Sequence, residues 1–540
     1  MTLPSLQQQR AHLLQEMASI DHMIRGHVST QTYRVERHGQ TVIQGPYYVL
    51  QRHQDGRNQC QRINDQEVEL VTTQVLAYKR YMELAERFAA LTEQLTWKEQ
   101  PEVIKKKVSP LLAACLPQTA AFLSQIWTRG LGRFADLETG FLAALKVDAA
   151  RLLEDLLNDP ELPLALPAAQ PGEQRSGTQP KMVLTLLGYI TLRSRQYLYD
   201  PQRQSGRFPL DQALELIEGY SPAVAKGMCR AGALAGSFEA ASQDLLTYLG
   251  LEIDGRQIQR MIERLGPRMA QWRTAQVPVH NPTAGEIFCV SGDGTGVAMR
   301  RKALRGRKGK RPGQRARTRE VKVGAVFTHR RPQNEEQRPE RDYQSTSYIA
   351  EISSAQEFGA ALRAEALRRG MGWAKVVVFL GDGAAWVWKV ARINFPGAVY
   401  ILDFYHATEH LMLLANALGG EGSPQAKKLF RRWRKYCRKD KVDQVIAQAR
   451  AQLPKGGKAR TLAKKQIAYL VRNRSRMLYE TFRKAGYFIG SGVGEAGCKT
   501  LVGQRLKQSG MLWELKGAGH LLTVRAALLS RWFDAFWKAA

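Results

Sequence analysis

The stretch Ile287-Phe288-Cys289-Val290-Ser291-Gly292-Asp293-Gly294-Thr295-Gly296-Val297 decides how we expect this chain to fold. Its apolar beginning, residues 287–290, has the composition of a short buried strand. The strand leads into Asp293, which stands between two glycines, and glycine lets the backbone pass close to whatever a carboxylate holds. We therefore expect a buried strand that ends at a functional carboxylate.

The same pattern recurs later in the chain. In Lys375-Val376-Val377-Val378-Phe379-Leu380-Gly381-Asp382-Gly383-Ala384, a second apolar strand ends in Gly-Asp-Gly. Two carboxylates at the ends of two buried strands can lie side by side and share divalent metal ions, because hard cations such as Mg²⁺ prefer carboxylate oxygens. The alternative is that Asp293 and Asp382 only form turns, a common role for aspartate.

The segments around the two aspartates predict the fold of a central domain. Apolar and alternating runs predict strands at 320–327, 348–352 and 398–403, and amphipathic spacing predicts a helix at 355–369. The order is three strands, helix, strand, helix, strand. An antiparallel set followed by βαβ crossovers is the order of an RNase H-like domain. The expected fold class is a multidomain α+β or α/β chain with an RNase H-like mixed sheet.

The net charge is the strongest signal in the composition. The 540 residues include 80 Lys and Arg against 49 Asp and Glu, a formal net charge of +31. A folded protein this basic usually meets a polyanion, with nucleic acid as the first candidate and a membrane surface as the second. No apolar run approaches the ~18 residues of a membrane span, and no signal peptide is visible. The scattered cysteines argue against a disulfide framework and a thiolate zinc site.

The length is too great for one hydrophobic core, so we expect several domains. They are a small α/β module at 1–100, a helical segment at 101–158, a Pro-rich linker at 159–181, a strand and helix-turn-helix region at 182–280, the first part of the RNase H-like core at 281–410, a helical insertion at 411–488, and the last part of the core with C-terminal helices at 489–540.

The region before the central domain contains a candidate DNA-binding motif. Residues 237–249 and 254–265 have the proportions of a helix-turn-helix, with Asp254 as a plausible N-cap. Its second helix presents Arg256 and Arg260, which are side chains of the type that reach phosphates and base edges. Helical hairpins are common, so a purely structural hairpin remains the alternative.

Two further segments concentrate positive charge. Residues 300–319 hold eleven Lys or Arg and no acid, and their glycines predict a flexible loop or hairpin tip. Residues 427–438 predict a helix with one basic face. Solvated charge runs are the alternative; beside a carboxylate site we expect DNA contacts. The expected contact residues are Arg256, Arg260, Arg300, Arg301, Lys302, Arg305, Arg307, Lys308, Lys310, Arg311, Arg315, Arg317, Arg431, Arg434, Lys435, Arg438, Lys499, Arg505 and Lys507.

A third carboxylate follows a glycine-rich turn at 490–494. Glu495 stands in the first turn of a predicted helix, where an acid also has a plain electrostatic reason to occur. Its rivals are Glu409 and Asp403, which follow a core strand. Asp403 and His406 form an incomplete metal site, so we expect them to orient the catalytic carboxylates or to lock the strand-to-helix turn.

From about Arg193 to Trp513, the sequence resembles bacterial insertion-sequence transposases of the Kra type, within the Mutator-like group of DDE transposases. An Asp or a Cys three residues before a His, just after the strand that follows the second Asp, marks this superfamily, and Asp403 and His406 supply it. The other matching stretches are Gly206-Arg207-Phe208-Pro209-Leu210-Asp211, residues 291–297, residues 381–386, and Gly490-Ser491-Gly492 with Glu495 and residues 499–513.

The resemblance implies that Asp293, Asp382 and Glu495 bind two Mg²⁺ ions, with Mn²⁺ as a substitute. It implies cleavage at the ends of a mobile element by water, and then attack of the freed 3′-OH on target DNA. The expected partners are double-stranded DNA and further copies of the chain, in the cytoplasm of a bacterium at the nucleoid, with no membrane partner.

Two alternatives remain open. An RNase H-like nuclease or resolvase needs the same carboxylates and differs only in lacking strand transfer. A non-catalytic DNA-binding protein derived from a transposase predicts that Asp293→Asn leaves every activity unchanged.

Overall fold

The computed structural model describes residues 3–37, 40–54, 57–119, 121–122, 133–277, 287–309, 314–330, 332 and 339–539. The chain divides into two compact units, Met1–Leu156 and Leu157–Ala540. Among the described helices, none is both long and apolar enough to cross a membrane.

The N-terminal unit combines an antiparallel sheet, in the order β1-β2-β3, with long helices. Its elements are α1 (Leu3–Ala18), β1 (His27–Arg37), β2 (Gln40–Gln54), β3 (Arg57–Ile63), α2 (Val68–Cys115) and α4 (Phe134–Leu157). Helix α1 packs along α2, and Leu6, Leu13 and Leu84 are buried. Because α2 is continuous across the boundary predicted at 100/101, the regions 1–100 and 101–158 share one helix.

The second unit opens with short strands: β4 (Gln174–Thr178), β5 (Lys181–Thr185), β6 (Gly188–Leu192), β7 (Gln196–Asp200) and β8 (Ser205–Arg207), followed by α5 (Pro209–Ala213). Strand β4 lies inside the stretch 159–181 that the sequence predicts as a linker, and it pairs with β7. An ion pair of 2.7 Å between Arg207 Nε and Glu173 Oε1 ties the end of this stretch to β8. A stretch with these long-range partners is part of the folded unit.

Three helices follow, α6 (Pro222–Leu234), α7 (Phe238–Leu249) and α8 (Gly255–Ala275). The predicted helical pair at 237–265 is confirmed, and so is the N-cap: Asp254 accepts a hydrogen bond from the Arg256 N–H, and Gln257 completes a capping box. Helix α8 continues ten residues beyond the predicted end at 265. It packs against α18 (Leu515–Leu529), so tertiary burial extends it.

The central sheet has the strand order β11-β10-β9-β13-β14, and β12 also pairs with β10. The strands are β9 (Ile287–Ala298), β10 (Thr318–Arg330), β11 (Glu340–Arg341), β12 (Ser347–Glu351), β13 (Val376–Gly381) and β14 (Val399–Leu402). Strand β9 is antiparallel to β10 and parallel to β13, and β13 is parallel to β14. With helices α9 (Ala355–Arg368) and α10 (Ala385–Asn394), the predicted succession of strands and helices is confirmed, except that the two-residue strand β11 was not predicted.

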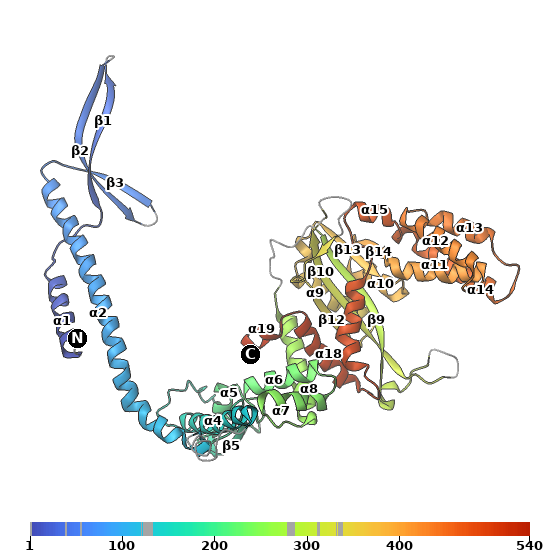
Figure 1. The fold of residues 1–540 in the computed structure, drawn as a ribbon, viewed down its shortest axis with the longest axis horizontal. Helices are drawn as coiled ribbons and strands as arrows, with labels where there is room; N and C mark the ends of the chain where they lie inside the picture. The colour runs from blue at the N-terminus through green and yellow to red at the C-terminus, as the bar shows by residue number, and fades with distance from the viewer. Residues whose placement is uncertain are drawn as a thin grey trace. The chain divides into compact units, whose positions relative to one another are not determined.

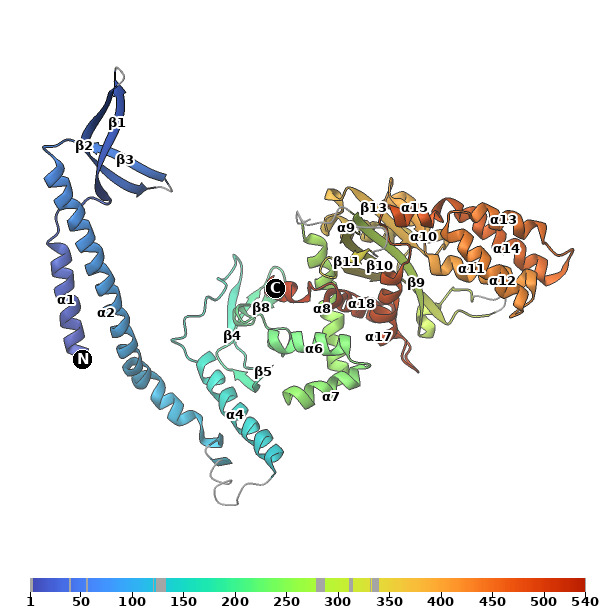
Figure 2. The ribbon, with the colours of Figure 1, turned by 45° about the horizontal axis from the view of Figure 1, so that its top comes forward.

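Helices cover both faces of this sheet (Figure 1). Helices α9 and α10 cover one face. The other is covered by α16 (Gly492–Gly497), the π-helix η4 (Cys498–Gly503) and α18, with α17 (Gln504–Leu506) and α19 (Phe533–Ala539) nearby. Helices α6–α8 share one hydrophobic core with α18, and Figure 2 shows them together. Helices α6–α8 and α18, which lie in regions that the sequence predicts to be separate, therefore pack together.

After β14 the chain forms a bundle of five helices, which we call the helical insertion (Figures 1 and 2). They are α11 (Phe404–Gly419), α12 (Pro424–Arg438), α13 (Val442–Ala451), α14 (Gly457–Asn473) and α15 (Tyr479–Lys484). The apolar face of α12 is buried through Trp433, whose Nε1–H donates to Gln448 Oε1 at 3.0 Å. The core of the bundle is continuous with that of the sheet.

Candidate active site

The structure brings Asp293 and Asp382 together. In the parallel register of β9 and β13, Gly292 lies beside Gly381, so the two aspartates follow at the same level on neighbouring strands. Burial, and then the Asp293 carboxylate, raise the pKa of Asp382, while the nearby His406 lowers it. Each carboxylate thus lies within electrostatic reach of the other, as two ligands of one cation must.

The prediction that both aspartates stand at strand ends is wrong for Asp293. Strand β9 runs on to Ala298, and Asp293 pairs with Val323 of β10 in mid-strand. Gly294 provides space instead of a turn, because a Cβ on it would lie 2.9 Å from Glu320 Oε1. Only the second Gly-Asp-Gly forms a turn, because Gly383 has a φ of +93°.

Helix α16, which carries Glu495, packs onto β9 directly beside Asp293. A Cβ on Gly494 would lie 2.8 Å from Ser291 Oγ and 3.9 Å from the Cβ of Asp293. The Glu495 side chain forms an ion pair of 3.9 Å with Lys499. Among the described residues, no group of three or more His, Cys, Asp or Glu side chains gathers closely enough to hold a metal ion. The structure therefore joins two of the three predicted carboxylates and places the third on the adjoining helix.

The sequence reasoning missed Cys498. Its thiol hydrogen-bonds Asp293, and burial and then the Asp293 carboxylate raise the pKa of that thiol, which keeps it protonated as a donor. In the sequence, Cys498 stands three residues after Glu495, about one helical turn further along. That spacing is the signal by which Cys498 could have been identified. The rival ligand Glu409 is exposed and pairs with His406 at 3.4 Å.

Asp403 joins three segments of the site. Its buried carboxylate caps α11 by accepting from the His406 N–H at 2.8 Å, and it also accepts from the Ser491 N–H. Its own N–H donates to the carbonyl of Gly381, the residue before Asp382, at 2.8 Å. The aspartate therefore links the Asp382 turn to the segment that leads into α16.

The donor chemistry of the aspartate pair fits a hard divalent cation. Both ligands are carboxylates, they lie on the same face of the sheet, and their mutual repulsion contributes to the raised pKa of Asp382. A cation between them would relieve that repulsion. The neighbouring Cys498 is protonated, so it does not offer a competing soft thiolate.

The predicted basic loop is a hairpin that extends β9 and β10. Lys308 and Arg315 form an antiparallel bridge, and Lys310 and Arg311 lie outside the described residues.

Lys507, which directly follows α17, lies beside the aspartate pair: its Nζ donates to Thr295 Oγ1, two residues from Asp293. The predicted DNA contacts that are exposed are Arg256, Arg260, Arg300, Arg301, Lys302, Arg305, Arg307, Lys308, Arg315, Arg317, Arg431, Arg434, Lys435, Arg438, Lys499 and Lys507.

Arg505 requires a correction. It is fully buried, its Nε–H donates to the Gly232 carbonyl at 3.0 Å, and its guanidinium lies over the rings of Phe238 and Trp513. A side chain without exposed surface has nothing to offer a phosphate, so the predicted DNA contact does not hold for Arg505. Charge alone could not reveal that this arginine ties α17 to α6.

The positive charge is very unevenly distributed. Residues 1–156 hold 18 Lys and Arg against 17 Asp and Glu, while residues 157–540 hold 62 against 32. Residues 411–488 alone hold 20 against 4. Nearly all the net charge therefore belongs to the unit that contains the aspartate pair, and about half of that belongs to the helical insertion.

No family model matches the sequence, and no curated protein matches it. Among the solved structures that match is one titled the Drosophila P element transposase strand transfer complex, at 9% sequence identity. That match covers 55% of this chain and 83% of the other, with a TM-score of 0.18. A similarity this weak supports no conclusion about the fold or activity of this chain.

Proposed function

We propose that this protein is a Mg²⁺-dependent DNA transposase with an RNase H-like catalytic domain. The observation that carries the proposal is the convergence of Asp293 and Asp382 within the unit that holds nearly all the net positive charge. The succession of antiparallel strands and βαβ crossovers supports the RNase H-like assignment. From the resemblance to Kra-type transposases, we further propose that the protein acts as a homo-oligomer on element ends and target DNA, at the bacterial nucleoid.

In the proposed reaction, water attacks phosphorus at an element end and breaks the P–O3′ bond, which leaves a 5′-phosphate and a free 3′-OH. That 3′-OH then attacks phosphorus in the target DNA, and the 3′-oxygen of the target strand leaves. Asp293 and Asp382 hold Mg²⁺, for which Mn²⁺ substitutes, and Glu495 is the proposed third ligand. Two Mg²⁺ ions bound there supply charge stabilisation for the attacking and leaving oxygens.

The surrounding side chains bind and orient the DNA in this proposal. Lys507, anchored on Thr295 beside Asp293, and Lys499 are close enough in sequence and space to the site to bind phosphates near the scissile bond. The basic hairpin at 300–319 and the helical insertion bind the flanking backbone, where Lys and Arg contribute affinity without reading sequence. Asp403 and His406 orient the segments that carry the acids.

The test is cleavage of labelled DNA that carries the flanking ends of the encoding element. Wild type and Asp293→Asn are compared in Mg²⁺ and in Ca²⁺, and DNA binding is measured in parallel. We expect nicks at the ends with Mg²⁺ in the wild type only, while the variant still binds DNA, because the substitution removes one metal ligand and leaves the basic surfaces intact.

The products separate the alternatives. Joined donor and target strands are expected of a transposase, whereas nicks that are never joined would identify a nuclease or resolvase. Binding without cleavage in either metal, equal in wild type and variant, would overturn the catalytic proposal in favour of a non-catalytic DNA-binding protein.

A further inference from the structure

The turn that carries Asp382 is braced by a residue from the helical insertion. Tyr469 of α14 is 8% exposed, and its hydroxyl donates to the main-chain carbonyl of Asp382 at 3.1 Å. A tyrosine phenol is protonated at neutral pH, so it can donate this hydrogen bond. This hydrogen bond therefore holds α14 against the turn that follows β13.

The space beside the turn is filled by the same tyrosine. Gly383 has a φ of +93°, which favours glycine, and a Cβ built there would lie 2.3 Å from the Tyr469 hydroxyl oxygen. The tyrosine therefore occupies the volume that a side chain at 383 would need. Both the hydrogen bond and this packing hold the main chain directly after the Asp382 Cα.

The Tyr469 ring is itself held in place. It stacks on the His410 ring with a centroid separation of 3.6 Å and an interplanar angle of 18°. His410 Nδ1 is hydrogen-bonded to Gln466 Oε1 at 2.6 Å, and Gln466 stands one turn before Tyr469 on α14. Helices α11 and α14 thus determine where the tyrosine hydroxyl points.

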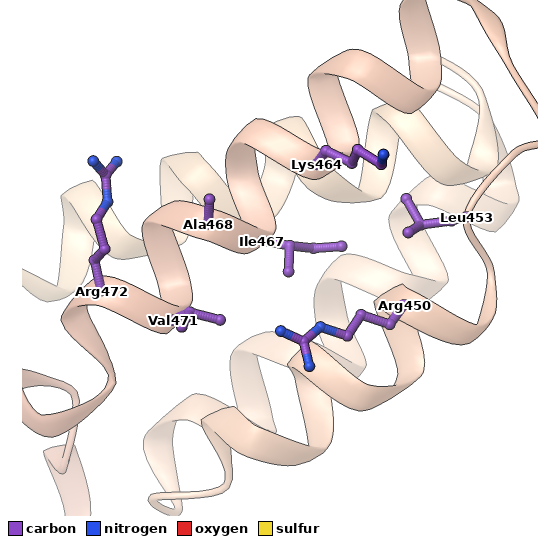
Figure 3. A pocket seen from close by; sticks show the side chains of 7 residues that line it. All are labelled: Arg450, Leu453, Lys464, Ile467, Ala468, Val471 and Arg472. Carbon is purple, nitrogen blue, oxygen red and sulfur yellow. The ribbon is translucent and has the colours of Figure 1, made fainter.

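The opposite face of α14 borders a groove of ≈ 690 Å³ between α13 and α14, with an apolar floor and three cationic side chains (Figure 3). The lining residues are Arg450, Leu453, Lys464, Ile467, Ala468, Val471 and Arg472. Helix α14 therefore carries Lys464 and Arg472 on the side that lines this groove, and Tyr469 on the side that contacts the Asp382 turn.

We propose that Tyr469 is a positioning residue for Asp382, which it holds in place from the helical insertion. The inference rests on the proposed function, in which the insertion binds DNA and Asp382 holds the metal. Under it, one hydroxyl and one ring of the most basic part of the chain contact the turn that carries Asp382, in addition to the link through Asp403. Removing the hydroxyl loosens the Asp382 turn and leaves the exposed lysines and arginines in place.

The test compares Tyr469→Phe with Tyr400→Phe in the full-length protein. Tyr400 provides a matched control, because its hydroxyl also donates to a main-chain carbonyl, that of Phe395, at 3.1 Å, and does not touch the Asp382 turn. For Tyr469→Phe we expect a single-turnover cleavage rate about tenfold lower at saturating DNA, the effect of losing about one hydrogen bond in the transition state. The midpoint of the Mg²⁺ dependence should rise and the Kd for DNA should stay unchanged. Tyr400→Phe should match the wild type in all three.

Hydrogen exchange provides a readout that does not need activity. The Ala384 N–H donates to Asp382 Oδ1 at 2.9 Å, so its exchange reports on the order of the turn. We expect faster exchange around 382–384 in Tyr469→Phe and wild-type exchange there in Tyr400→Phe. Unchanged exchange, or a wild-type cleavage rate with an unchanged Mg²⁺ midpoint, would overturn the inference. Faster exchange in a protein whose wild type cleaves no DNA would uphold the brace and overturn the proposed function instead.

Discussion

Among single residues, Asp382 makes the folded state sensitive to pH. Burial and Asp293 raise its pKa above 3.8, so the folded chain binds this proton more tightly than the unfolded chain does. Protonation of Asp382 therefore stabilises the folded state. This contribution is complete below about pH 3.8, the pKa of the unfolded chain, and is lost as the pH rises through the higher pKa of the folded state. We therefore expect Asp382→Asn to raise the thermal midpoint of unfolding at pH 7 and to leave it almost unchanged near pH 3.5.

Asp211 provides the opposite case as a control. Burial acts to raise its pKa, but hydrogen bonds from Arg195 and Lys181 outweigh burial and lower it. Asp211→Asn should therefore lower the midpoint at pH 7. In a chain of this size a change of 1 kcal/mol moves the midpoint by roughly 1 °C, which calorimetry resolves. A lower midpoint for Asp382→Asn at pH 7 would contradict the strained carboxylate pair.

Gly494 is the residue that allows α16 to lie against β9. A methyl group at 494 would stand 2.8 Å from Ser291 Oγ, so Gly494→Ala must shift either that side chain or α16, which carries Glu495. A displacement of ~1 Å can cost about 10²-fold in rate, and overpacking costs about 1–3 kcal/mol of stability. We therefore expect Gly494→Ala to cleave DNA up to about 10²-fold more slowly and to bind DNA as the wild type does.

The matched control is Gly492→Ala, two residues earlier on the same helix. Nothing lies within 4 Å of a Cβ built at 492, so α16 has no reason to move. Cleavage and binding should stay close to wild type in this variant. Equal activity of the two alanine variants would show that the packing of α16 on β9 is unimportant for the reaction.

Between elements, Asp403 joins α11, the Asp382 turn and the segment before α16. Asp403→Ala leaves the buried N–H groups of His406 and Ser491 without their acceptor, at about 1–3 kcal/mol for each unsatisfied group. We expect a clear loss of thermal stability together with a loss of cleavage. Asp403→Asn, which keeps one acceptor oxygen, should lie between Asp403→Ala and wild type in both measurements.

The control for Asp403 is Ser423, which caps α12 by accepting from the Ala426 N–H at 3.0 Å. Ser423→Ala removes a helix cap at a cost of about 1 kcal/mol and touches nothing near the aspartates. It should lower stability modestly and leave cleavage unchanged. If both variants lost cleavage equally, general destabilisation would explain the effect of Asp403→Ala.

The elements show what local sequence could and could not predict. Periodicity and turn residues sufficed for the succession of strands and helices in the central sheet and for the N-cap Asp254, because these depend on neighbouring residues. The mid-strand position of Asp293 escaped prediction, since spacing glycines and turn glycines look alike in sequence. Tyr469 and the buried Arg505 depend on contacts between distant segments, which no local pattern encodes.

Across the whole chain, the uneven charge predicts where DNA affinity resides. Each phosphate contact that is lost should reduce the slope of log K against log salt by about 0.9. Replacing Arg431, Arg434 and Lys435 of α12 together by alanine should therefore flatten the slope by up to about 2.7, because all three are exposed and lie in the segment with 20 basic and 4 acidic residues.

A charge-matched triple variant in the N-terminal unit separates local contacts from the overall charge. Arg34, Lys79 and Arg87 are exposed, and residues 1–156 are nearly neutral, with 18 basic against 17 acidic residues. Alanine at these three positions removes the same formal charge and should leave the slope unchanged, because no excess of positive charge there draws the phosphate backbone. Fluorescence anisotropy with one labelled duplex across a salt series measures both slopes. Equal flattening by the two triple variants would mean that the net charge of the whole chain, and not the helical insertion, governs DNA affinity.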